Sequence, residues 1–192
     1  ISEDLCWYYP SSLNNLTFAQ SSFTHIGSSL PNFGSINCYN FTFFPTNSAT
    51  TINRSSGEWN IDGELVVYDG TLTFSNPDSV KLSRLLHMNG NINFPSNVPL
   101  KVGASIYQTN IYGANLNFSS GHSTVIDVPF GTGSIYISAP FQNLTTRFGN
   151  IGLISDITIN ESLTLQSGII NTVTFDTFYV KINQSAIVTR TE

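Results

Sequence analysis

The sequence has little charge of either sign. Charged residues make up 10% of the 192-residue chain, against about 25% in ordinary soluble proteins, and the formal net charge is -5. The hydrophobic fraction of 40%, which includes 14 Phe and 8 Tyr, excludes intrinsic disorder. The 7 Lys and Arg residues are scattered, so no basic stripe is present to neutralise a run of phosphates. We therefore expect a folded protein without a nucleic-acid partner.

Long apolar runs are also missing. No run approaches the roughly 18 residues that a membrane-spanning helix needs, so we expect no membrane span in the mature chain. The first residue is Ile1, and Ser2-Glu3-Asp4 after it is neither a charged n-region nor an apolar h-region. We interpret this start as a mature, extracellular chain that has lost its signal segment, although a trimmed chain would begin in the same way.

Cysteine is scarce, with Cys6 and Cys38 alone in the chain. A single disulfide between them would suit a secreted protein and is our expectation. Two free, buried thiols are the alternative.

Asparagine, by contrast, is abundant and often lies in Asn-X-Ser/Thr sequons. In an extended strand the Asn and the hydroxyl residue share one face while the middle residue points to the other. The middle residue is Leu or Phe in four sequons, which would place it in the core and the Asn in solvent, although strand alternation in any Asn-rich protein creates some such triplets. We expect N-linked glycans, and no other cofactor, at these positions: Asn15, Asn40, Asn53, Asn117, Asn143, Asn160 and Asn183.

Apolar residues alternate with period two along nearly the whole chain, which predicts strands. Asp69-Gly70 and Asn89-Gly90 lie between alternating runs and predict type I′ hairpins, because those turns require positive φ at both central residues. The one candidate helix covers 78–88 after Pro77 and competes with the second hairpin for the same residues. We prefer a short helix or turn that leads into a strand there.

Short strands recurring every 8 to 12 residues or so predict an antiparallel β-sandwich, Ig-like or pilin-like, with at most one short helix. No fixed repeat length appears, which argues against a β-solenoid, although the run 151–182 keeps that alternative open. The composition is uniform and no linker divides it. We expect a single sandwich domain over 11–192, preceded by an extension over 1–10.

The densest acidic stretch runs from Glu58 to Glu64. Alternation places Glu58, Asn60, Asp62 and Glu64 on one face. Two carboxylates facing a cleft could act as general acid and base on a glycoside, and several together could hold Ca²⁺. The solvated outer face of a strand explains the same pattern without a function, and we prefer that interpretation.

No other pattern indicates a reaction. His25, His87 and His122 are far apart and have no metal-ligand spacing, and Gly121-His122-Ser123 lacks a Gly-x-Ser-x-Gly elbow. We therefore expect no metal site and no enzyme. Exposed aromatic residues could still stack on sugars, although burial is their commoner fate.

The charge deficit itself has two consequences. A chain with few ion pairs has few to lose on acidification, so the composition suits a protein exposed to acid; a secreted protein kept soluble by Asn, Ser and glycans is the competing explanation. Strands without charged gatekeepers also leave sheet edges free to pair with neighbouring chains. Either carbohydrate covers those edges or edge pairing is the function.

The N-terminal segment favours edge pairing. Ile1, Leu5, Trp7 and Tyr9 form an apolar face that Glu3 interrupts, as expected of a strand added to the groove of another subunit. Such head-to-tail contacts do not close and therefore build filaments. The alternative is that the segment is the first strand of its own sandwich. The apolar run 178–188 is a second donor candidate, ranked below the N-terminus.

A charge-poor, sequon-rich chain of this length with an amphipathic terminal strand resembles the thread filament subunits of thermoacidophilic crenarchaea of the Sulfolobales type. The resemblance implies a pilin-like architecture, heavy N-glycosylation at the seven sequon asparagines, and donor-strand complementation through the segment 1–9. Cys6 lies inside that segment. A disulfide to Cys38 of the same subunit would restrict the reach of the strand, whereas one across subunits would lock the fibre.

The leading hypothesis from the sequence is a non-enzymatic, glycosylated subunit of an extracellular filament. We expect it to serve adhesion or biofilm formation, with identical subunits as its partners. The alternative is a secreted carbohydrate-binding β-sandwich or an adhesin domain, which includes viral ones. A glycoside hydrolase ranks third.

Overall fold

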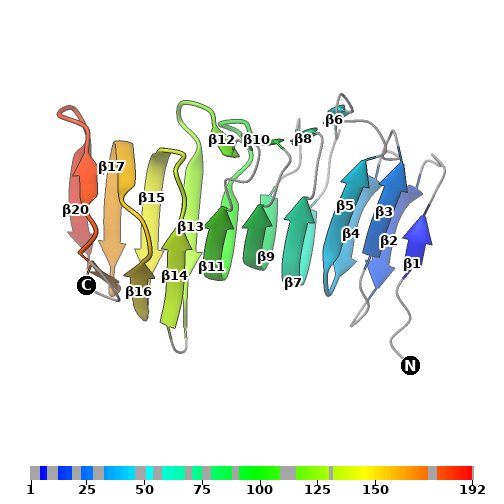
Figure 1. The fold of residues 1–192 in the computed structure, drawn as a ribbon, viewed down its shortest axis with the longest axis horizontal. Helices are drawn as coiled ribbons and strands as arrows, with labels where there is room; N and C mark the ends of the chain where they lie inside the picture. Colours follow the sequence, from blue (N-terminus) through cyan, green and yellow to red (C-terminus); the bar gives the residue numbers. More distant parts are fainter. Residues whose placement is uncertain are drawn as a thin grey trace.

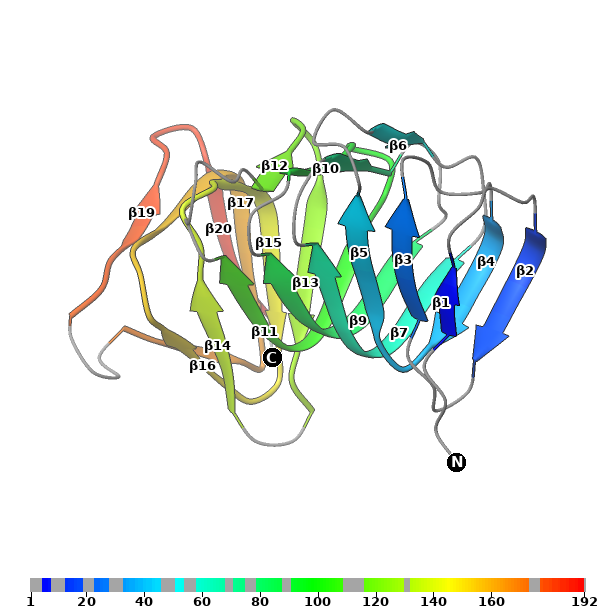
Figure 2. The ribbon, with the colours of Figure 1, turned by 45° about the vertical axis from the view of Figure 1, so that its right-hand side comes forward.

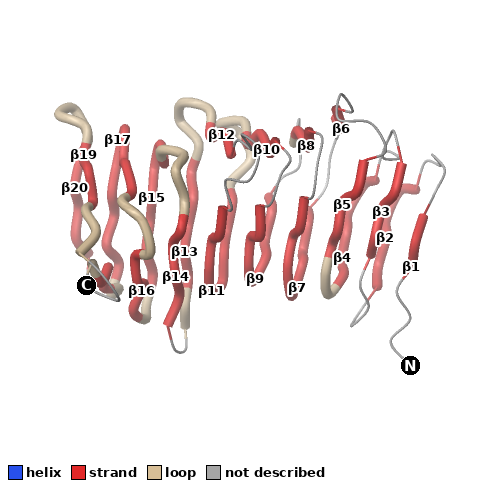
Figure 3. The backbone as a smooth tube through the Cα atoms, viewed as in Figure 1, coloured by secondary structure: helices blue, strands red, loops and turns tan. Residues whose placement is uncertain are grey.

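The computed structural model describes residues 5–7, 13–18, 23–27, 33–45, 51–53, 58–67, 71–74, 79–87, 91–108, 116–129, 132–172 and 177–191. All regular structure in these segments is β-strand (Figure 3). The side chains of the strands before Asn37 lie outside the description, so only their backbone enters the argument.

The strands stack into a parallel β-solenoid, in which each turn of the chain lies on the previous one. Figure 1 shows the stack from β1 (Leu5–Trp7) at one end to β20 (Ile187–Thr191) at the other. Every strand pairing among the described residues is parallel, from β1 with β3 to β17 with β20. The expectation of an antiparallel β-sandwich is therefore wrong, and the solenoid alternative is the observed fold.

Each coil contributes strands to three faces, which Figure 2 shows wrapped around a common interior. The first face contains β2 (Leu13–Phe18), β4 (Phe33–Cys38), β13 (Ser123–Asp127) and β20. The second face contains β1, β3 (Phe23–Gly27), β5 (Phe41–Pro45), β14 (Thr132–Tyr136), β16 (Asn150–Leu153) and β18 (Ile169–Asn171). The third face contains β6 (Thr51–Asn53), β8 (Thr71–Thr73), β10 (Asn91–Phe94), β12 (Leu116–Phe118) and β19 (Val180–Ile182).

Five longer strands bend around the corners and join the faces. The corner between the first and second faces is turned by β7 (Glu58–Val67), β9 (Ser79–His87) and β11 (Leu100–Gln108). The corner between the third and first faces is turned by β15 (Phe141–Arg147) and β17 (Ile157–Gln166). These bends connect the first face, the second face and β19 of the third face into one hydrogen-bonded sheet. The other strands of the third face, β6, β8, β10 and β12, form a separate four-stranded sheet.

Alternation decides which side chains enter the core. In a strand, every second side chain points inward, and the parallel register then places the inward residues of successive coils on top of one another. Leu72, Ile92 and Leu116 form one such column, and each is almost fully buried. Burial of each of these side chains stabilises the fold by roughly 1.5–3 kcal/mol.

An aromatic column continues along the interior. Its neighbouring ring centroids lie 4.8 Å apart for Phe41 and Trp59, 5.1 Å for Trp59 and Phe74, 5.0 Å for Phe74 and Phe94, 5.6 Å for Phe94 and Phe118, and 5.5 Å for Phe118 and Phe141. These separations suit favourable aromatic pairs, each worth about 0.5–1.5 kcal/mol beyond area burial. The 14 Phe residues of the chain thus serve in part as an internal stack.

On the solvent-facing side of the third face, the stacked side chains are polar and form hydrogen bonds with one another. The Asn93 amide donates to Thr73 at 2.9 Å, and the Asn117 amide donates to Asn93 at 2.8 Å. On the first face Asn60 donates to Asn37 at 2.9 Å in the same manner. Such ladders arise because in-register parallel strands hold amide and hydroxyl side chains at a repeat of about 4.8 Å.

Both hairpin predictions are wrong. Leu65, before Asp69-Gly70, pairs with Phe41 and Leu85, while Leu72 after that dipeptide pairs with Ile52 and Ile92. The strands on either side of the dipeptide therefore belong to different faces and do not pair with each other. The same holds for β9 and β10 on either side of Asn89-Gly90; both dipeptides lie outside the described residues. The candidate helix 78–88 is also wrong, because β9 occupies Ser79–His87.

Alternation could not distinguish the two folds, because inward and outward residues alternate equally in a sandwich and in a solenoid. A fixed repeat would have done so, but stacked side chains that bind each other are separated by 18 residues for Asn143 and Glu161 and by 24 for Asn93 and Asn117. Corners of variable length absorb these differences. The strands themselves stay in register.

The expected disulfide is absent, and the stack explains why. Cys6 pairs with Thr24 of the next coil, and Thr24 pairs with Thr42 of the coil after it, so Thr42 lies two coils from Cys6. Cys38 ends β4, directly before the strand that contains Thr42. Two rung spacings amount to about 10 Å, which exceeds the roughly 7 Å Cα separation that a disulfide spans. Cys38 is a free, buried thiol, and burial, assisted by the charge of Asp62, raises its pKa to about 12.

The N-terminal segment contributes the first strand of the second face. Leu5 and Trp7 lie in β1, which pairs with Phe23 and His25 of β3 in the same chain. Ile1 and Tyr9 lie outside the described residues. The part of 1–10 that the structure describes is thus a rung of its own stack, and its role as a donor to another subunit stays a prediction.

The aromatic column predicts a large, local loss of stability on truncation. Phe94→Ala should lower the free energy of unfolding by about 3–5 kcal/mol, because the column would enclose a cavity. Phe148→Ala is the matched control, since Phe148 is 51% exposed and its loss should change stability by no more than about 0.5 kcal/mol. Urea denaturation of both variants measures the difference. Equal losses would contradict the internal column.

Candidate functional site

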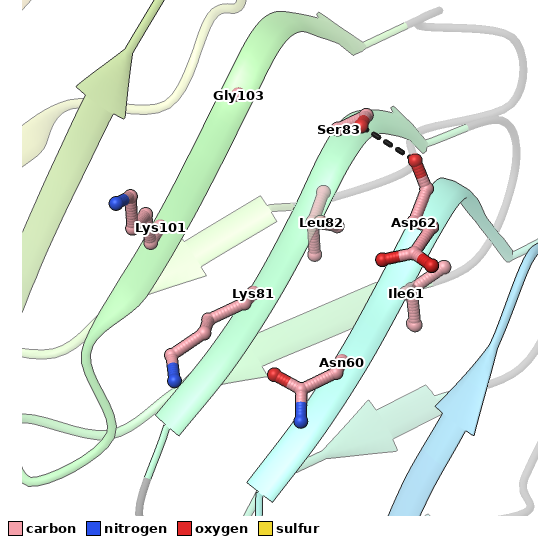
Figure 4. Close-up of a pocket in the computed structure, with 8 residues that line it drawn as sticks. All are labelled: Asn60, Ile61, Asp62, Lys81, Leu82, Ser83, Lys101 and Gly103. Carbon is pink, nitrogen blue, oxygen red and sulfur yellow. Dashed lines mark hydrogen bonds between the residues drawn. The ribbon is translucent and has the colours of Figure 1, made fainter. Parts of the chain in front are cut away.

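A polar groove runs along the corner between the first and second faces. Its volume is about 230 Å³, and it crosses three successive coils. Figure 4 shows the lining residues on β7, β9 and β11, with the Asp62 carboxylate and the Asn60 amide leaning toward β9. The lining consists of Asn60, Ile61, Asp62, Lys81, Leu82, Ser83, Lys101 and Gly103.

Bulges at the corner create this hollow. The register shifts between Ile61 and Glu64 on β7, and between Val102 and Ser105 on β11, so that the single residue Ser83 of β9 lies between two-residue bulges. Bulges bend a strand and redirect its side chains. The Ser83 hydroxyl donates to the Asp62 carbonyl across the bend (Figure 4). Glycine and serine at the corner leave the space open.

Ion pairs between neighbouring coils border the groove. Lys81 lies 3.3 Å from Glu58, and the hydrogen bond and charge of Lys81 hold the pKa of the Glu58 carboxyl below its usual value. Arg84 lies 2.8 Å from Glu64, at the end of the acidic stretch. Because these side chains are in good part exposed to solvent, each pair contributes little to stability. They position charge along the groove more than they stabilise the fold.

The acidic stretch is the outer face of a strand, as its alternation indicates. Trp59, Ile61 and Leu65 are buried, whereas Glu58, Asn60, Asp62 and Glu64 are exposed or half-buried. Glu58 and Glu64 each bind a basic residue of the next coil, so two carboxylates of the acidic stretch are engaged in ion pairs. Within the described segments, no group of three or more His, Cys, Asp or Glu is placed to hold a metal ion.

The histidines are dispersed over the stack, as their spacing predicts. His25 lies in β3 and His87 in β9, while His122 is fully buried beside the aromatic column. The His122 ring stacks on Phe118 with centroids 4.8 Å apart, and Nδ1 lies 3.3 Å from the Thr124 hydroxyl. Burial lowers the pKa of His122 to about 4. The ring is neutral at physiological pH and belongs to the core.

A second candidate surface is the uncovered end of the core at the last coil. A cavity of about 290 Å³ opens there between the last strands. Val188 is 55% exposed, whereas Leu163 beneath it in the same column is 4% exposed. Ile182 is 41% exposed over a fully buried Ile159. These are core positions that no described coil covers. The cavity is lined by Leu163, Leu165, Gly168, Ile169, Ile170, Val180, Ile182 and Arg190.

No relative identifies either surface. Searches of protein-family models, curated proteins and solved structures find no match to this chain. The corner groove and the open last coil are therefore the features of the chain that bear on its function. In the described part of the chain, no helix is long and apolar enough to cross a membrane.

The sequon asparagines occupy different positions in the stack. Asn15 lies in β2 and Asn53 in β6, where the structure describes the backbone alone. Asn40 lies at the corner before β5, and its side-chain oxygen accepts from the backbone nitrogen of Glu64 at 2.8 Å. The other four lie in or beside later strands: Asn117 in β12, Asn143 in β15, Asn160 in β17, and Asn183 in the turn after β19.

Sequence reasoning missed the basic side of the groove. Lys81 and Lys101 are paired in register with each other, and Lys81 is also paired with Asn60. Asn60, Lys81 and Lys101 are each about one coil apart in the sequence, and this spacing is the signal that could have predicted their proximity. The variable length of the coils obscured it. Alternation in the sequence indicates the apolar run at the C-terminus. Only the stacking of the coils shows that its core-facing residues are exposed.

The buried His122 predicts an acid-sensitive fold. Its folded pKa of about 4 lies below the ordinary 6.5, so its contribution to stability is complete above pH 6.5 and is lost as the pH falls toward 4. We expect the free energy of unfolding to drop by about 2 kcal/mol between pH 7.5 and pH 5. His122→Phe, which retains a stacking ring, should remove most of this drop. Urea denaturation at both pH values measures it, and an unchanged drop in the variant would contradict the assignment.

Proposed function

We propose that the chain is a non-enzymatic structural subunit of an extracellular filament, in which the last coil of one copy is covered by the first coil of the next. The observation that supports it is the exposure of core-column residues at the last coil, above all Val188 and Ile182. A role in adhesion or biofilm formation follows from an extracellular fibre and is part of the proposal.

Backbone geometry suits such end-to-end stacking. At the C-terminal end of the described stack, β18 pairs with β16, and β19 and β20 pair with β17, and no described strand follows them. At the N-terminal end, β1 pairs with β3 and β2 with β4, and no other described strand pairs with β1 or β2. Unpaired edges are templates for a further strand. Joining two unlike ends of identical subunits does not close, so it builds a filament.

Charge complementarity favours a second copy as the covering partner. Glu3 and Asp4 are the charged residues at the start of the chain, and no Lys or Arg precedes Arg54. The last described segment, 177–191, has Lys181 and Arg190, of which Lys181 is ion-paired with Asp156 at 2.7 Å, so Arg190 is the basic residue that this end offers. Arg190 is paired with Leu165 of the previous coil, and it lines the open cavity. Opposite charge at the two ends steers them together and fixes their orientation.

This mechanism replaces the invasion of a sandwich groove. A solenoid offers an open edge, so the strand that includes Leu5 and Trp7 would pair with the last coil while it remains part of its own chain. The proposal thus keeps the N-terminal segment as a contact to the next subunit. It does not require that the segment leave its own stack.

The filament proposal predicts a specific effect of charge at the open coil. The wild-type chain should form fibres in electron micrographs and fast-sedimenting species whose fraction increases with concentration. Val188→Lys should leave discrete monomers, because it places an ammonium group over a core column. Thr189→Lys adds the same charge to the outward side of the same strand and should not prevent assembly.

Two results would contradict the filament. One is a wild-type chain that stays monomeric at every concentration, which would leave the open coil without a second copy. The other is equal assembly of the two lysine variants. Thermal melts by circular dichroism serve as the control for folding, since both substitutions lie at exposed positions of the last strand.

The corner groove favours a second candidate function, the binding of a neutral saccharide. Asp62 supplies an acceptor, Lys81 supplies a donor, and the Asn60 amide and Ser83 hydroxyl complete a polar wall. Sugar hydroxyls need both donors and acceptors, and a groove across three coils suits an extended chain. This is the adhesin alternative, without its sandwich fold.

Titration calorimetry with neutral oligosaccharides tests this candidate. Asp62→Ala should weaken binding roughly 10- to 100-fold, the effect of removing a hydrogen bond to a charged group. Asn150→Ala, at an exposed position of β16, is the control and should bind like the wild type. Absence of binding by the wild type, or equal binding by both variants, would exclude the groove.

A further inference from the structure

We propose that the folded chain carries an N-linked glycan at Asn183 and none at Asn143. Both positions carry an Asn-X-Ser/Thr sequon, and their environments in the fold are opposite. The inference is tested on the glycan mass of the single chain, so its outcome can be told apart from the outcome of the assembly test.

Asn143 has no side-chain hydrogen-bonding group to spare. Its amide nitrogen donates to Glu161 Oε2 at 2.9 Å and to the His122 carbonyl at 3.3 Å. Its amide oxygen accepts from the Ser162 hydroxyl at 2.6 Å. A side-chain amide has two N–H donors, so both are used. Asn143 is also part-buried between neighbouring strands.

Glu161 makes this arrangement rigid. Its other oxygen, Oε1, accepts from the Ser120 hydroxyl and from the Gly121 backbone nitrogen, each at 2.8 Å. Hydrogen bonds from Gly121, Ser120 and Asn143 hold the pKa of the Glu161 carboxyl below its usual value. Hydrogen bonds to a carboxylate are stronger than neutral ones. We call Glu161, Ser162 and their contacts to Asn143 the carboxylate clasp.

Glycosylation is incompatible with the carboxylate clasp for a chemical reason. The transferase uses a lipid phosphate-linked saccharide, which the secreting cell supplies. The amide nitrogen forms a bond to C1 of the sugar, the bond from C1 to the phosphate oxygen breaks, and the phosphate leaves with the electron pair. One amide proton is lost to a base. At Asn143 that proton is one of the two in use, so a glycan there breaks the bond to Glu161 or the bond to His122.

Asn183 is in the reverse situation. It lies in the exposed turn between β19 and β20, and Gln184 and Ser185 after it are exposed as well. Its backbone nitrogen donates to the Ile159 carbonyl at 2.8 Å, and its carbonyl accepts from the Ala186 nitrogen at 2.9 Å. Its side-chain amide forms no hydrogen bond with any residue that the structure describes. A glycan can therefore be added without loss of a contact.

Two further sequons lie between these extremes. The Asn117 amide donates once, to Asn93 at 2.8 Å, and the Asn160 amide donates once, to Gln142 at 3.3 Å. Each thus has a second amide proton that a glycan can replace. Asn183 and Asn143 are the clear contrast, and the test is built on them.

The test uses the full chain, secreted from a eukaryotic host that glycosylates Asn-X-Ser/Thr and purified as folded protein. Ser185→Ala and Thr145→Ala each remove the hydroxyl residue of one sequon and leave the asparagine in place. Intact mass spectrometry should show that Ser185→Ala loses the mass of one glycan and that Thr145→Ala has the mass of the wild type, apart from the substitution. Peptide mapping after enzymatic glycan release in ¹⁸O water identifies the modified asparagines.

The stability of the unglycosylated protein provides a second measurement. Asn143→Gln should lower the melting temperature, because the longer side chain cannot fit the carboxylate clasp, while Asn183→Gln should leave it unchanged. A glycan on Asn143 of the folded, secreted protein overturns the proposal. So does an unmodified Asn183, whether or not other sequons are occupied, and so does an equal melting temperature for the two Gln variants.

Discussion

In-register parallel pairing is the constraint on which the rest of this structure depends. Because each strand lies directly over its counterpart in the previous coil, a side chain meets a similar environment above and below. Apolar positions become columns, such as that of Leu144, Leu163 and Val188 on the first face. The columns need no charged residue to hold them, which is consistent with a chain of 10% charged residues that folds into an extended stack.

The same constraint organises the polar surface. Asn93 between Thr73 and Asn117 is held by its neighbours along the stack, and so is Asn143 between His122 and the Glu161 carboxylate. Abundant asparagine is therefore partly structural in this fold. A count of sequons treats these residues as equivalent, whereas the stack divides them into amides that are engaged and amides that are free.

Repetition also leaves the described core open at the last coil. Val188 and Ile182 extend core columns that no described coil covers, and Arg190 beside them is opposite in charge to Glu3 and Asp4 at the start of the sequence. The buried core also limits the pH range in which the stack stays folded. Few ion pairs make the composition suited to acid, but the burial of neutral His122 works in the opposite direction, because its protonation favours unfolding.

The sequence by itself determined that the chain is all-β, which residues alternate inward, and that the Glu58–Glu64 stretch faces out, since these follow from the period of a strand. It also pointed to the C-terminal apolar run. The sandwich, the hairpins and the disulfide of Cys6 and Cys38 were wrong, because alternation is the same for parallel and antiparallel neighbours. Only the tertiary structure decided which strands pair. That choice rests on contacts between residues a variable coil apart, and it alone brought Lys81 to the groove and Glu161 to Asn143.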